Sequence, residues 1–302
     1  MWKYALKRIL LAIVTVFIII IITFFAMNAI PGGPFESEKA PEPSVRKALE
    51  ARYNLDKPIG EQFLIYVGNL LQGDFGISLK TGRDIATTIW TSFAISARLG
   101  GMAAAAAVVV GVILGSLAAL SRNKWPDRVI IFFTTLFVSV PSFVLATILL
   151  LVFCLQLNWF PVWDASTTSY FLPVLALALY PMSYIIRLTK SSMLDVLGQD
   201  YIRTARSKGL KERIVIFKHA LRNALIPVIT YVGPMLAYIL TGSLVVETVF
   251  TIGGLGSKFV TSIAHRDYPM IMATTIFLAT LMVVMTLLSV LIYKAVDRKS
   301  VV

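Results

Sequence analysis

The side chains that most often carry chemistry are few in this sequence and lie far apart. There are two histidines, His219 and His265, and a single cysteine, Cys154, which lies inside an apolar run. A metal site needs several such ligands close together, and a disulfide needs a second cysteine. No pair of carboxylates lies within the apolar runs, where acid–base chemistry would need one. The sequence therefore predicts neither a catalytic centre nor a metal or cofactor site in this chain.

Glu247 is the acidic residue that lies nearest to a membrane-like run, at the end of one. Ionisable residues in such places are functional candidates, and the alternative is a structural hydrogen bond or an interface role. The segment "TIGGLGSKF" that follows contains Gly254 and Gly256, but it lacks the G-x-x-x-x-G-K-[ST] spacing of a phosphate loop. We expect Glu247, Gly254 and Gly256 to have a structural or gating role.

The composition is that of an integral membrane protein. Of the 302 residues, 57% are hydrophobic and 15% are charged, and the mean hydropathy is +0.80. Soluble domains carry about 25% charged residues. The net charge of +12 could suggest a nucleic-acid partner, but the basic residues flank apolar runs. We therefore expect contact with membrane lipid and no nucleic acid.

Six charge-free runs are long enough to cross a bilayer, whose core of about 30 Å needs roughly 20 helical residues. They are Ile9–Ile30, Leu99–Leu120, Val129–Trp163, Ala165–Ile186, Asn223–Val246 and Tyr268–Tyr293. The third is longer than one span and is expected to end near Leu157. Pro173 and Pro181 interrupt the fourth, so five spans are the main alternative. The first run is longer than the core of a signal peptide, and we expect it to be a retained anchor.

The distribution of charge predicts the orientation of these spans. The two termini and the loops 121–128 and 187–222 together carry +13, whereas the segments between them on the other side carry −1. By the positive-inside rule, both termini and both basic loops are cytoplasmic. The segment Pro31–Arg98 and the candidate Glu247 then lie on the outer side.

The outer segment Pro31–Arg98 is too long for a simple turn. Its first part is rich in proline and glutamate and is expected to be an extended loop. A short helix is predicted over 44–53, and a second, amphipathic helix is predicted within "PIGEQFLIYVGNLLQGDFG". We expect a small extracytoplasmic segment that contacts another external protein or the outer gate.

The second apolar run is rich in alanine and glycine and contains Gly111 and Gly115 in the spacing G-x-x-x-G. Small residues at this spacing let two helix backbones approach closely in lipid. The run is therefore predicted to pack inside a bundle rather than to face lipid all round.

The densest basic stretch, "DYIRTARSKGLKERIVIFKHALRNALIP", has its own predicted order of elements. Gly198 ends the preceding helix, Asp200 caps a short helix over Tyr201–Lys208, and Gly209 ends it in a left-handed conformation. A return helix follows, and Pro227 is expected to kink it where it enters the fifth span. Its apolar face is formed by Leu210, Ile214, Phe217, Leu221 and Leu225. The alternative is an ordinary basic loop that only sets topology.

This stretch resembles the cytoplasmic coupling motif of binding-protein-dependent ABC importer permeases, written Glu-Ala-Ala-x-x-x-Gly. Arg203, Thr204 and Ala205 stand at the Glu-Ala-Ala positions before Gly209, and arginine in place of glutamate is a departure that the peptide-permease branch also shows. The segments "GDFGISL", "VPSF", "TGSLVVETVF", "GGLG" and "RDYP" are similar, in order and spacing, to oligopeptide and dipeptide permease B subunits. The chain looks most like the oligopeptide branch.

The resemblance implies a type I ABC importer permease fold in a bacterial cytoplasmic (inner) membrane. It implies an N-terminal part, 1–98, and a five-helix permease core, 99–302, which contains the coupling loop 187–226. The expected partners are a homologous second permease subunit, two cytoplasmic ATPase subunits that bind ATP and Mg²⁺, an extracytoplasmic peptide-binding protein and the peptide itself. The residues expected to dock on an ATPase are Tyr201, Arg203, Thr204, Ala205, Arg206, Gly209 and Leu210.

The resemblance leaves the cargo open between oligopeptides, which are favoured, and dipeptides, nickel or glutathione. From another class, a secondary transporter or channel would run without ATPase partners, but its ionisable residues usually lie near the midplane, which is empty of charge here. An intramembrane enzyme would need a catalytic constellation that the sequence lacks. The chain itself is predicted not to be an enzyme.

Overall fold

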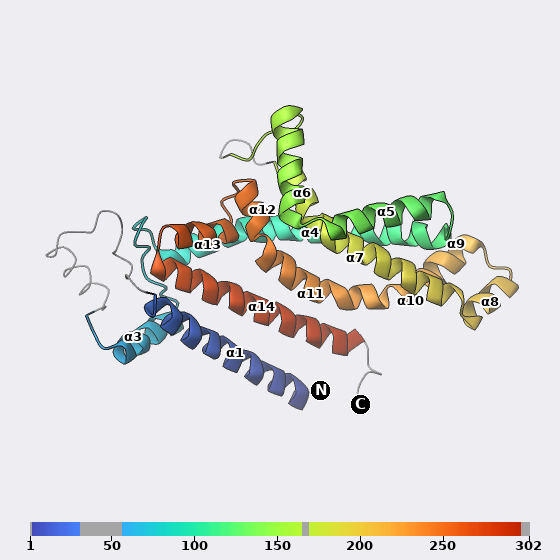
Figure 1. The fold of residues 1–302 in the computed structure, drawn as a ribbon. Coiled ribbons are helices and arrows are strands. Elements are labelled where there is room, and N and C mark those ends of the chain that lie inside the picture. Colours follow the sequence, from blue (N-terminus) through green and yellow to red (C-terminus); the bar gives the residue numbers. More distant parts are fainter. Residues whose placement is uncertain (1, 31–55, 165–168, 297–302) are drawn as a thin grey trace. The chain divides into compact units, whose positions relative to one another are not determined.

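The computed structural model describes residues 2–30, 56–164 and 169–296 of the chain, and these ranges are predominantly helical (Figure 1). Within them, the β-structure consists of one isolated bridge between Ile77 and Asp84. The all-α prediction is therefore confirmed. The predicted helix over 44–53 lies outside the described residues.

Four described helices are long and apolar enough to cross a membrane. They are α1 (Trp2–Asn28), α4 (Ile85–Leu120), α7 (Phe171–Leu197) and α14 (Tyr268–Val296). Helix α4 begins at Ile85 rather than at the start of the charge-free run at Leu99, so Arg98 lies within it. The charge-free run predicted the membrane segment correctly and the start of the helix too late.

Two further spans are bent helix pairs, which brings the number of candidate spans to as many as six. In the first, α5 (Trp125–Ser139) meets α6 (Ser142–Leu149) and the π-helical η1 (Leu150–Gln156) at 105°. Pro141 lacks an N–H and forces Val140 into an extended conformation, with φ −89° and ψ 128°. The predicted end of the third run near Leu157 is confirmed, but its treatment as one straight span is wrong.

The second bent pair includes the predicted return helix. It consists of α9 (Glu212–Ile214), η2 (Val215–Leu221) and α10 (Arg222–Ala224), followed by α11 (Ile226–Gly242) at an angle of 48°. The break lies at Leu225, and Pro227 stands in the first turn of α11, where its missing N–H costs no hydrogen bond. The kink expected at Pro227 is confirmed to within two residues.

The chain divides into two compact units, each described here by itself. Unit 1 comprises Met1–Ile95 and Gly253–Val283, and unit 2 comprises Ser96–Ile252 and Val284–Val302. The division into 1–98 and 99–302 made from the sequence is a functional one and stays a prediction.

Unit 1 contains α1, α3 (Ile59–Leu71), the start of α4, α13 (Leu255–Ala264) and most of α14. Helix α3 is the amphipathic helix predicted for the outer segment. Phe24 of α1 packs on it, with ring centroids 5.3 Å from Phe63 and 5.6 Å from Tyr66. A second cluster joins the start of α4 to α13 and α14 through the buried Ile85, Ile89, Leu255, Met270 and Ala273.

Unit 2 is built around α7, which packs along α5, α6 and α11 (Figure 1). Helix α4 approaches it closely at the two glycines. A Cβ on Gly111 would lie 2.7 Å from Cγ2 of Ile185, and one on Gly115 would lie 2.7 Å from the carbonyl oxygen of Ile186. The prediction that small residues bury this helix in a bundle is therefore confirmed. Lys190 of α7 also forms an ion pair of 2.5 Å with Asp127 of α5.

Candidate functional site

The predicted coupling helix is present as α8 (Asp200–Ser207), which follows α7 after the Gly198 cap. Its N-cap is Gln199, whose side chain makes no capping bond, so the prediction that Asp200 caps the helix is wrong. Asp200 instead opens the first turn, where a carboxylate is favoured by the helix dipole. Its Oδ1 lies 3.6 Å from Nη1 of Arg203, an exposed and therefore weak ion pair.

The glycine corner that ends α8 is confirmed. Gly209 has φ +73°, a conformation that is unfavourable for residues with a Cβ, and no atom lies within 4 Å of the position of its missing Cβ. Glycine is therefore needed for its backbone rather than for space. Across the corner, Nη2 of Arg206 donates to Oε1 of Glu212 at 2.7 Å, and this bond raises the pKa of Arg206.

One face of α8 is buried against the rest of unit 2. Ile202 is fully buried and Ala205 is 6% exposed. They belong to a cluster that also contains Ala119 of α4, Met193 of α7 and residues of η2 and α10; its other members are Val215, Ala220 and Ala224. Helix α8 is thus packed directly on the ends of two spans, which is the arrangement that a mechanical lever requires.

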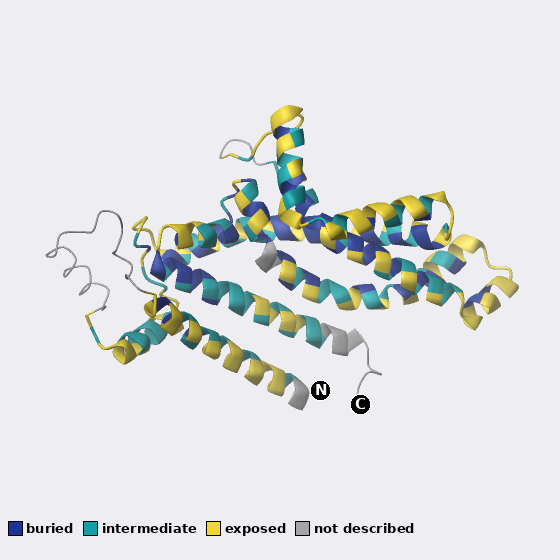
Figure 2. Ribbon diagram, viewed as in Figure 1, coloured by how far each residue is buried: buried dark blue, intermediate teal, exposed yellow. Residues whose placement is uncertain are grey.

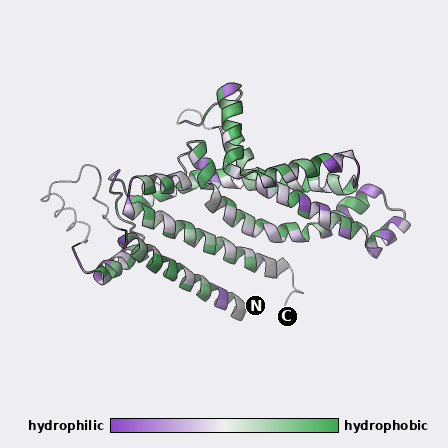
Figure 3. Ribbon diagram, in the orientation of Figure 1, coloured by the Kyte–Doolittle hydropathy of each residue, from purple (hydrophilic) through white to green (hydrophobic). Residues whose placement is uncertain are grey.

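The other face of α8 is exposed and polar, and it is among the most hydrophilic parts of the described chain (Figure 3). Tyr201, Arg203 and Thr204 lie on it, and the hydroxyl of Tyr201 accepts a hydrogen bond of 3.0 Å from Nδ2 of Asn223. The exposed members of the predicted docking set are Tyr201, Arg203, Thr204, Arg206, Gly209 and Leu210.

Ala205 differs from the rest of this set because its side chain points into the core of unit 2. Its small size allows α8 to approach the return helix. Sequence reasoning placed it on the docking surface because a motif position does not show which side of a short helix is covered.

Glu247, in α12 (Leu244–Val249), is completely buried in unit 2. Its Oε1 accepts hydrogen bonds from Oγ of Ser96 at 2.7 Å and from Oγ of Ser243 at 2.5 Å. This arrangement supports the structural hydrogen-bond alternative. Gly254 and Gly256 belong to unit 1, as the N-cap and a buried residue of α13, so these three candidates form no single described site.

A second buried carboxylate was missed by the sequence reasoning. Asp267 is 4% exposed, and it accepts hydrogen bonds from Oγ of Ser78 at 2.5 Å and from the backbone N–H of Leu79 at 3.1 Å. It thereby joins the segment before α4 to the start of α14 within unit 1. The aspartate of "RDYP" was a visible signal, but its partners lie far away in the sequence.

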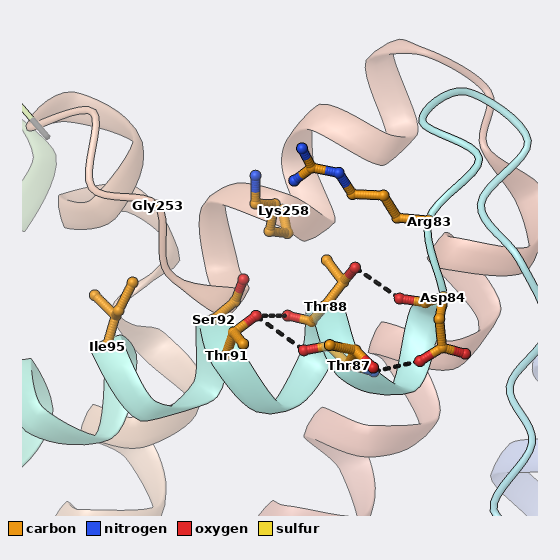
Figure 4. A pocket seen from close by; sticks show the side chains of 9 residues that line it. All are labelled: Arg83, Asp84, Thr87, Thr88, Thr91, Ser92, Ile95, Gly253 and Lys258. Atoms are coloured by element: carbon orange, nitrogen blue, oxygen red, sulfur yellow. Dashed lines mark hydrogen bonds between the residues drawn. The ribbon is translucent and has the colours of Figure 1, made fainter.

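Unit 1 also has a polar pocket of about 510 Å³ at the beginning of α4 (Figure 4). Its lining combines hydroxyl groups with two cations and consists of Arg83, Asp84, Thr87, Thr88, Thr91, Ser92, Ile95, Gly253 and Lys258. Among the described residues, neither the guanidinium of Arg83 nor the ammonium of Lys258 has a carboxylate within ion-pair distance. The pocket therefore suits an anionic or strongly polar group.

Asp84 at the edge of this pocket is committed to the helix rather than to a ligand. Its Oδ2 accepts a hydrogen bond of 2.7 Å from the backbone N–H of Thr87 and so caps α4. Hydrogen bonds from the side chain and backbone of Thr87 lower the pKa of Asp84.

The described residues contain no group of three or more histidine, cysteine, aspartate or glutamate side chains that could hold a metal ion. The site thus consists of a packed lever, two buried carboxylates and a polar pocket. This is the equipment of a membrane component that moves and binds.

Solved structures with the same fold come from ABC importers. The chain aligns with the crystal structure of an amino acid ABC transporter with histidines at a TM-score of 0.52 and 18% identity, covering 69% of this chain and 94% of that one. It aligns with the inward-facing methionine ABC transporter MetNI at a TM-score of 0.58 and 17% identity, covering 70% and 96%. The predicted type I ABC importer permease fold is confirmed.

Two family models match the chain, the "Binding-protein-dependent transport system inner membrane component" over residues 111–302 and its N-terminal counterpart over 1–99. The chain belongs to this family of multi-pass inner membrane proteins, which are permease components and not ATPases.

Similar proteins within the family are named as peptide permeases. The chain is 42% identical to the oligopeptide transport system permease protein OppB of Haemophilus influenzae, over 99% of both chains. It is 44% identical to the dipeptide transport system permease protein DppB of Bacillus subtilis, over 99% of this chain and 98% of that one. The OppB protein of Salmonella typhimurium is 40% identical over 99% of both. The predicted membership of the oligopeptide/dipeptide permease family is confirmed.

Proposed function

We propose that this chain is one of two permease subunits of an ATP-driven importer that carries oligopeptides into the cell. The observation that supports it most is the seat of α8, where Ile202 and Ala205 are packed against the ends of α4 and α7. Nucleotide-driven movement of a partner that holds α8 would be transmitted to these spans. Alternation between two states of the spans is how such a protein would expose a passage to each side in turn.

The other parts of the importer follow from this role. A homologous permease subunit forms the second half of the passage, and two ATPase subunits bind ATP and Mg²⁺ in the cytoplasm. An extracytoplasmic binding protein delivers the peptide. The positive-inside rule places both termini and α8 in the cytoplasm, and it places the pocket with Arg83 and Lys258 on the side of the binding protein.

The substrate assignment is supported by the OppB relatives, but a dipeptide permease is the second candidate because the Bacillus subtilis DppB protein is similar over nearly the same length. To decide, the complete importer is purified in mild detergent, reconstituted in vesicles and given peptides of increasing length. We expect ATP-dependent uptake of peptides longer than two residues. Uptake of dipeptides alone would support the second candidate, and uptake driven by an ion gradient without ATP would contradict the proposal.

The docking surface is tested by reversing one charge on it. Arg203→Glu changes an exposed side chain on the outward face of α8, and we expect it to reduce peptide-stimulated ATP hydrolysis at least several-fold while the subunit still inserts. Lys218→Glu is the matched control, because Lys218 is an exposed cation of the neighbouring return helix and not a member of the proposed docking set. Equal effects of the two substitutions would contradict docking through this face.

A further inference from the structure

Helix α7 exposes a polar stripe although it is the most buried of the four long spans. In its most apolar window 56% of residues are buried, against 11% in α1. After Phe171, the positions that remain exposed are Tyr180, Tyr184, Arg187, Ser191 and Asp195. Their spacing of three or four residues places them on a single face. The one open side of this span is therefore lined by hydroxyl groups and charges.

Two tyrosines of α11 extend this face within unit 2. The ring centroids of Tyr184 and Tyr231 are 4.3 Å apart, and those of Tyr180 and Tyr238 are 6.5 Å apart. Tyr180, Tyr184 and Tyr238 are 43%, 47% and 56% exposed. These four residues, called the tyrosine stripe below, follow the line along which α7 and α11 meet.

A surface of this kind is unsuited to lipid. Moving a hydroxyl from water into hydrocarbon without a hydrogen bond costs about 4–8 kcal/mol, and a charged side chain in the bilayer also costs several kcal/mol. Tyrosine is common at the membrane interface, but Tyr180 is the tenth residue of α7 and lies roughly 14 Å along its axis. That is about half of a hydrocarbon core of about 30 Å. An aqueous passage accounts for hydroxyl groups at this depth.

The same two helices hold the coupling loop. Helix α7 leads into α8 through Gly198 and Gln199, and α11 follows the return helix that packs on α8. A movement of α8 would therefore displace both sides of the tyrosine stripe. This continuity favours a surface that changes its exposure during transport over a static anchor in the membrane interface.

We propose that the tyrosine stripe lines the translocation passage and binds the backbone of an extended peptide, an inference that rests on the proposed function. Each hydroxyl can donate to a peptide carbonyl and accept from a peptide N–H, and each ring can pack on apolar side chains. Tyr180 and Tyr184 are about 6 Å apart along the helix axis, which is close to the rise of about 6.6 Å for two residues of an extended strand. Backbone recognition of this kind selects peptides without selecting their sequence.

The first test measures access from water in the assembled importer. Tyr180→Cys, Tyr184→Cys and Tyr238→Cys are made separately in a Cys154→Ala background, with Ile13→Cys and Phe17→Cys in α1 as controls of similar exposure, 61% and 48%. A charged methanethiosulfonate reagent is applied to vesicles that contain all subunits. We expect the three stripe positions to react at least 10-fold faster than the controls, and a casein digest with binding protein to slow them at least 3-fold.

Two results would overturn the proposal. Stripe positions that react as slowly as Ile13→Cys and Phe17→Cys in the assembled importer are covered by lipid or by the second permease subunit. Fast reaction that the peptide digest does not slow means that the face is wet but does not bind peptide. Neither readout requires transport, so they remain distinct from a failure of the proposed function, which would appear as a wild-type importer that takes up no peptide with ATP.

The second test removes hydroxyl groups and keeps the rings. We expect Tyr180→Phe and Tyr238→Phe each to reduce peptide uptake about 2- to 10-fold, the range for the loss of one hydrogen bond. The control is Tyr66→Phe, since the hydroxyl of Tyr66 is buried in unit 1 and has no hydrogen-bond partner within the described residues. Wild-type uptake by the double variant Tyr180→Phe/Tyr238→Phe would overturn peptide binding by these hydroxyls.

Discussion

Helices α1 and α7 are both long enough to span a membrane, but their exposed sides have opposite chemistry (Figure 2). From Ile9 to Phe25, every exposed residue of α1 is apolar except Thr15, whose hydroxyl donates to the carbonyl of Leu11 at 2.8 Å. The exposed residues of α7 beyond Phe171 are tyrosines, a serine and charged side chains. Length and composition identify both helices as spans, whereas the chemistry of the exposed side distinguishes a lipid-facing anchor from a wall of a passage.

The largest effect is expected where α7 is held from its buried side. Gly115→Leu would place a Cβ 2.7 Å from the carbonyl oxygen of Ile186 and from Cβ of Thr189, and the backbone of α7 cannot move away without losing its packing. We expect overpacking that costs at least about 3 kcal/mol and a large loss of folded protein in size-exclusion chromatography. Gly101→Leu in the same helix is the control, because no atom lies within 4 Å of its Cβ position. Equal yields would contradict this close packing.

A charge placed on each exposed side compares α1 and α7 directly. Ile13→Lys puts an ammonium on the lipid-facing side of α1, where the cost of insertion is about 2.5–3.5 kcal/mol. Tyr184→Lys puts the same group on the stripe of α7, where water is expected to solvate it and the cost to be much smaller. The membrane-inserted fraction after alkaline extraction measures both. Equal losses would remove the distinction between an anchor and a passage wall.

Glu247 sharpens the comparison, because it is an ionisable group that is buried rather than exposed. Glu247→Leu removes the acceptor of Ser96 and Ser243, and a buried group left without its partner costs about 1–3 kcal/mol. Glu247→Gln retains a carbonyl oxygen and should cost less. Thermal unfolding of the purified importer measures the difference. A Gln variant as unstable as the Leu variant would indicate that the charge itself is required.

The smallest effect is expected at the start of α4, outside the membrane. Asp84→Ala removes the cap and should cost about 1 kcal/mol, whereas Asp84→Asn retains a capping oxygen. Because folding lowers the pKa of Asp84, its ionised form contributes stability above the ordinary pKa of about 3.9. This contribution is lost as the pH falls through the lower, folded-state value. Unfolding midpoints at neutral and acid pH should therefore converge for wild type and Asp84→Asn.

Local patterns predicted the coupling loop well because its elements depend on neighbouring residues. Gly209 has the left-handed φ that its position after the short helix required, and Pro227 lies beside the bend between α10 and α11. The break at Pro141 was also written in the sequence, but the uninterrupted apolar run around it outweighed one proline. The burial of Ala205 and the bonds of Asp267 could not be predicted, since both depend on residues from distant parts of the chain.

The sequence by itself determined that the chain is a helical membrane protein, how its charges are distributed and where the coupling loop lies. These properties follow from apolar length, charge counts and short-range helix signals, which act within about 20 residues. The tertiary structure decided which side of each helix is covered. Gly111 and Gly115 bury one side of α7, and the side left open carries the tyrosines. Hydropathy averages over all sides of a helix, so only packing between distant segments can separate a surface for lipid from one for peptide.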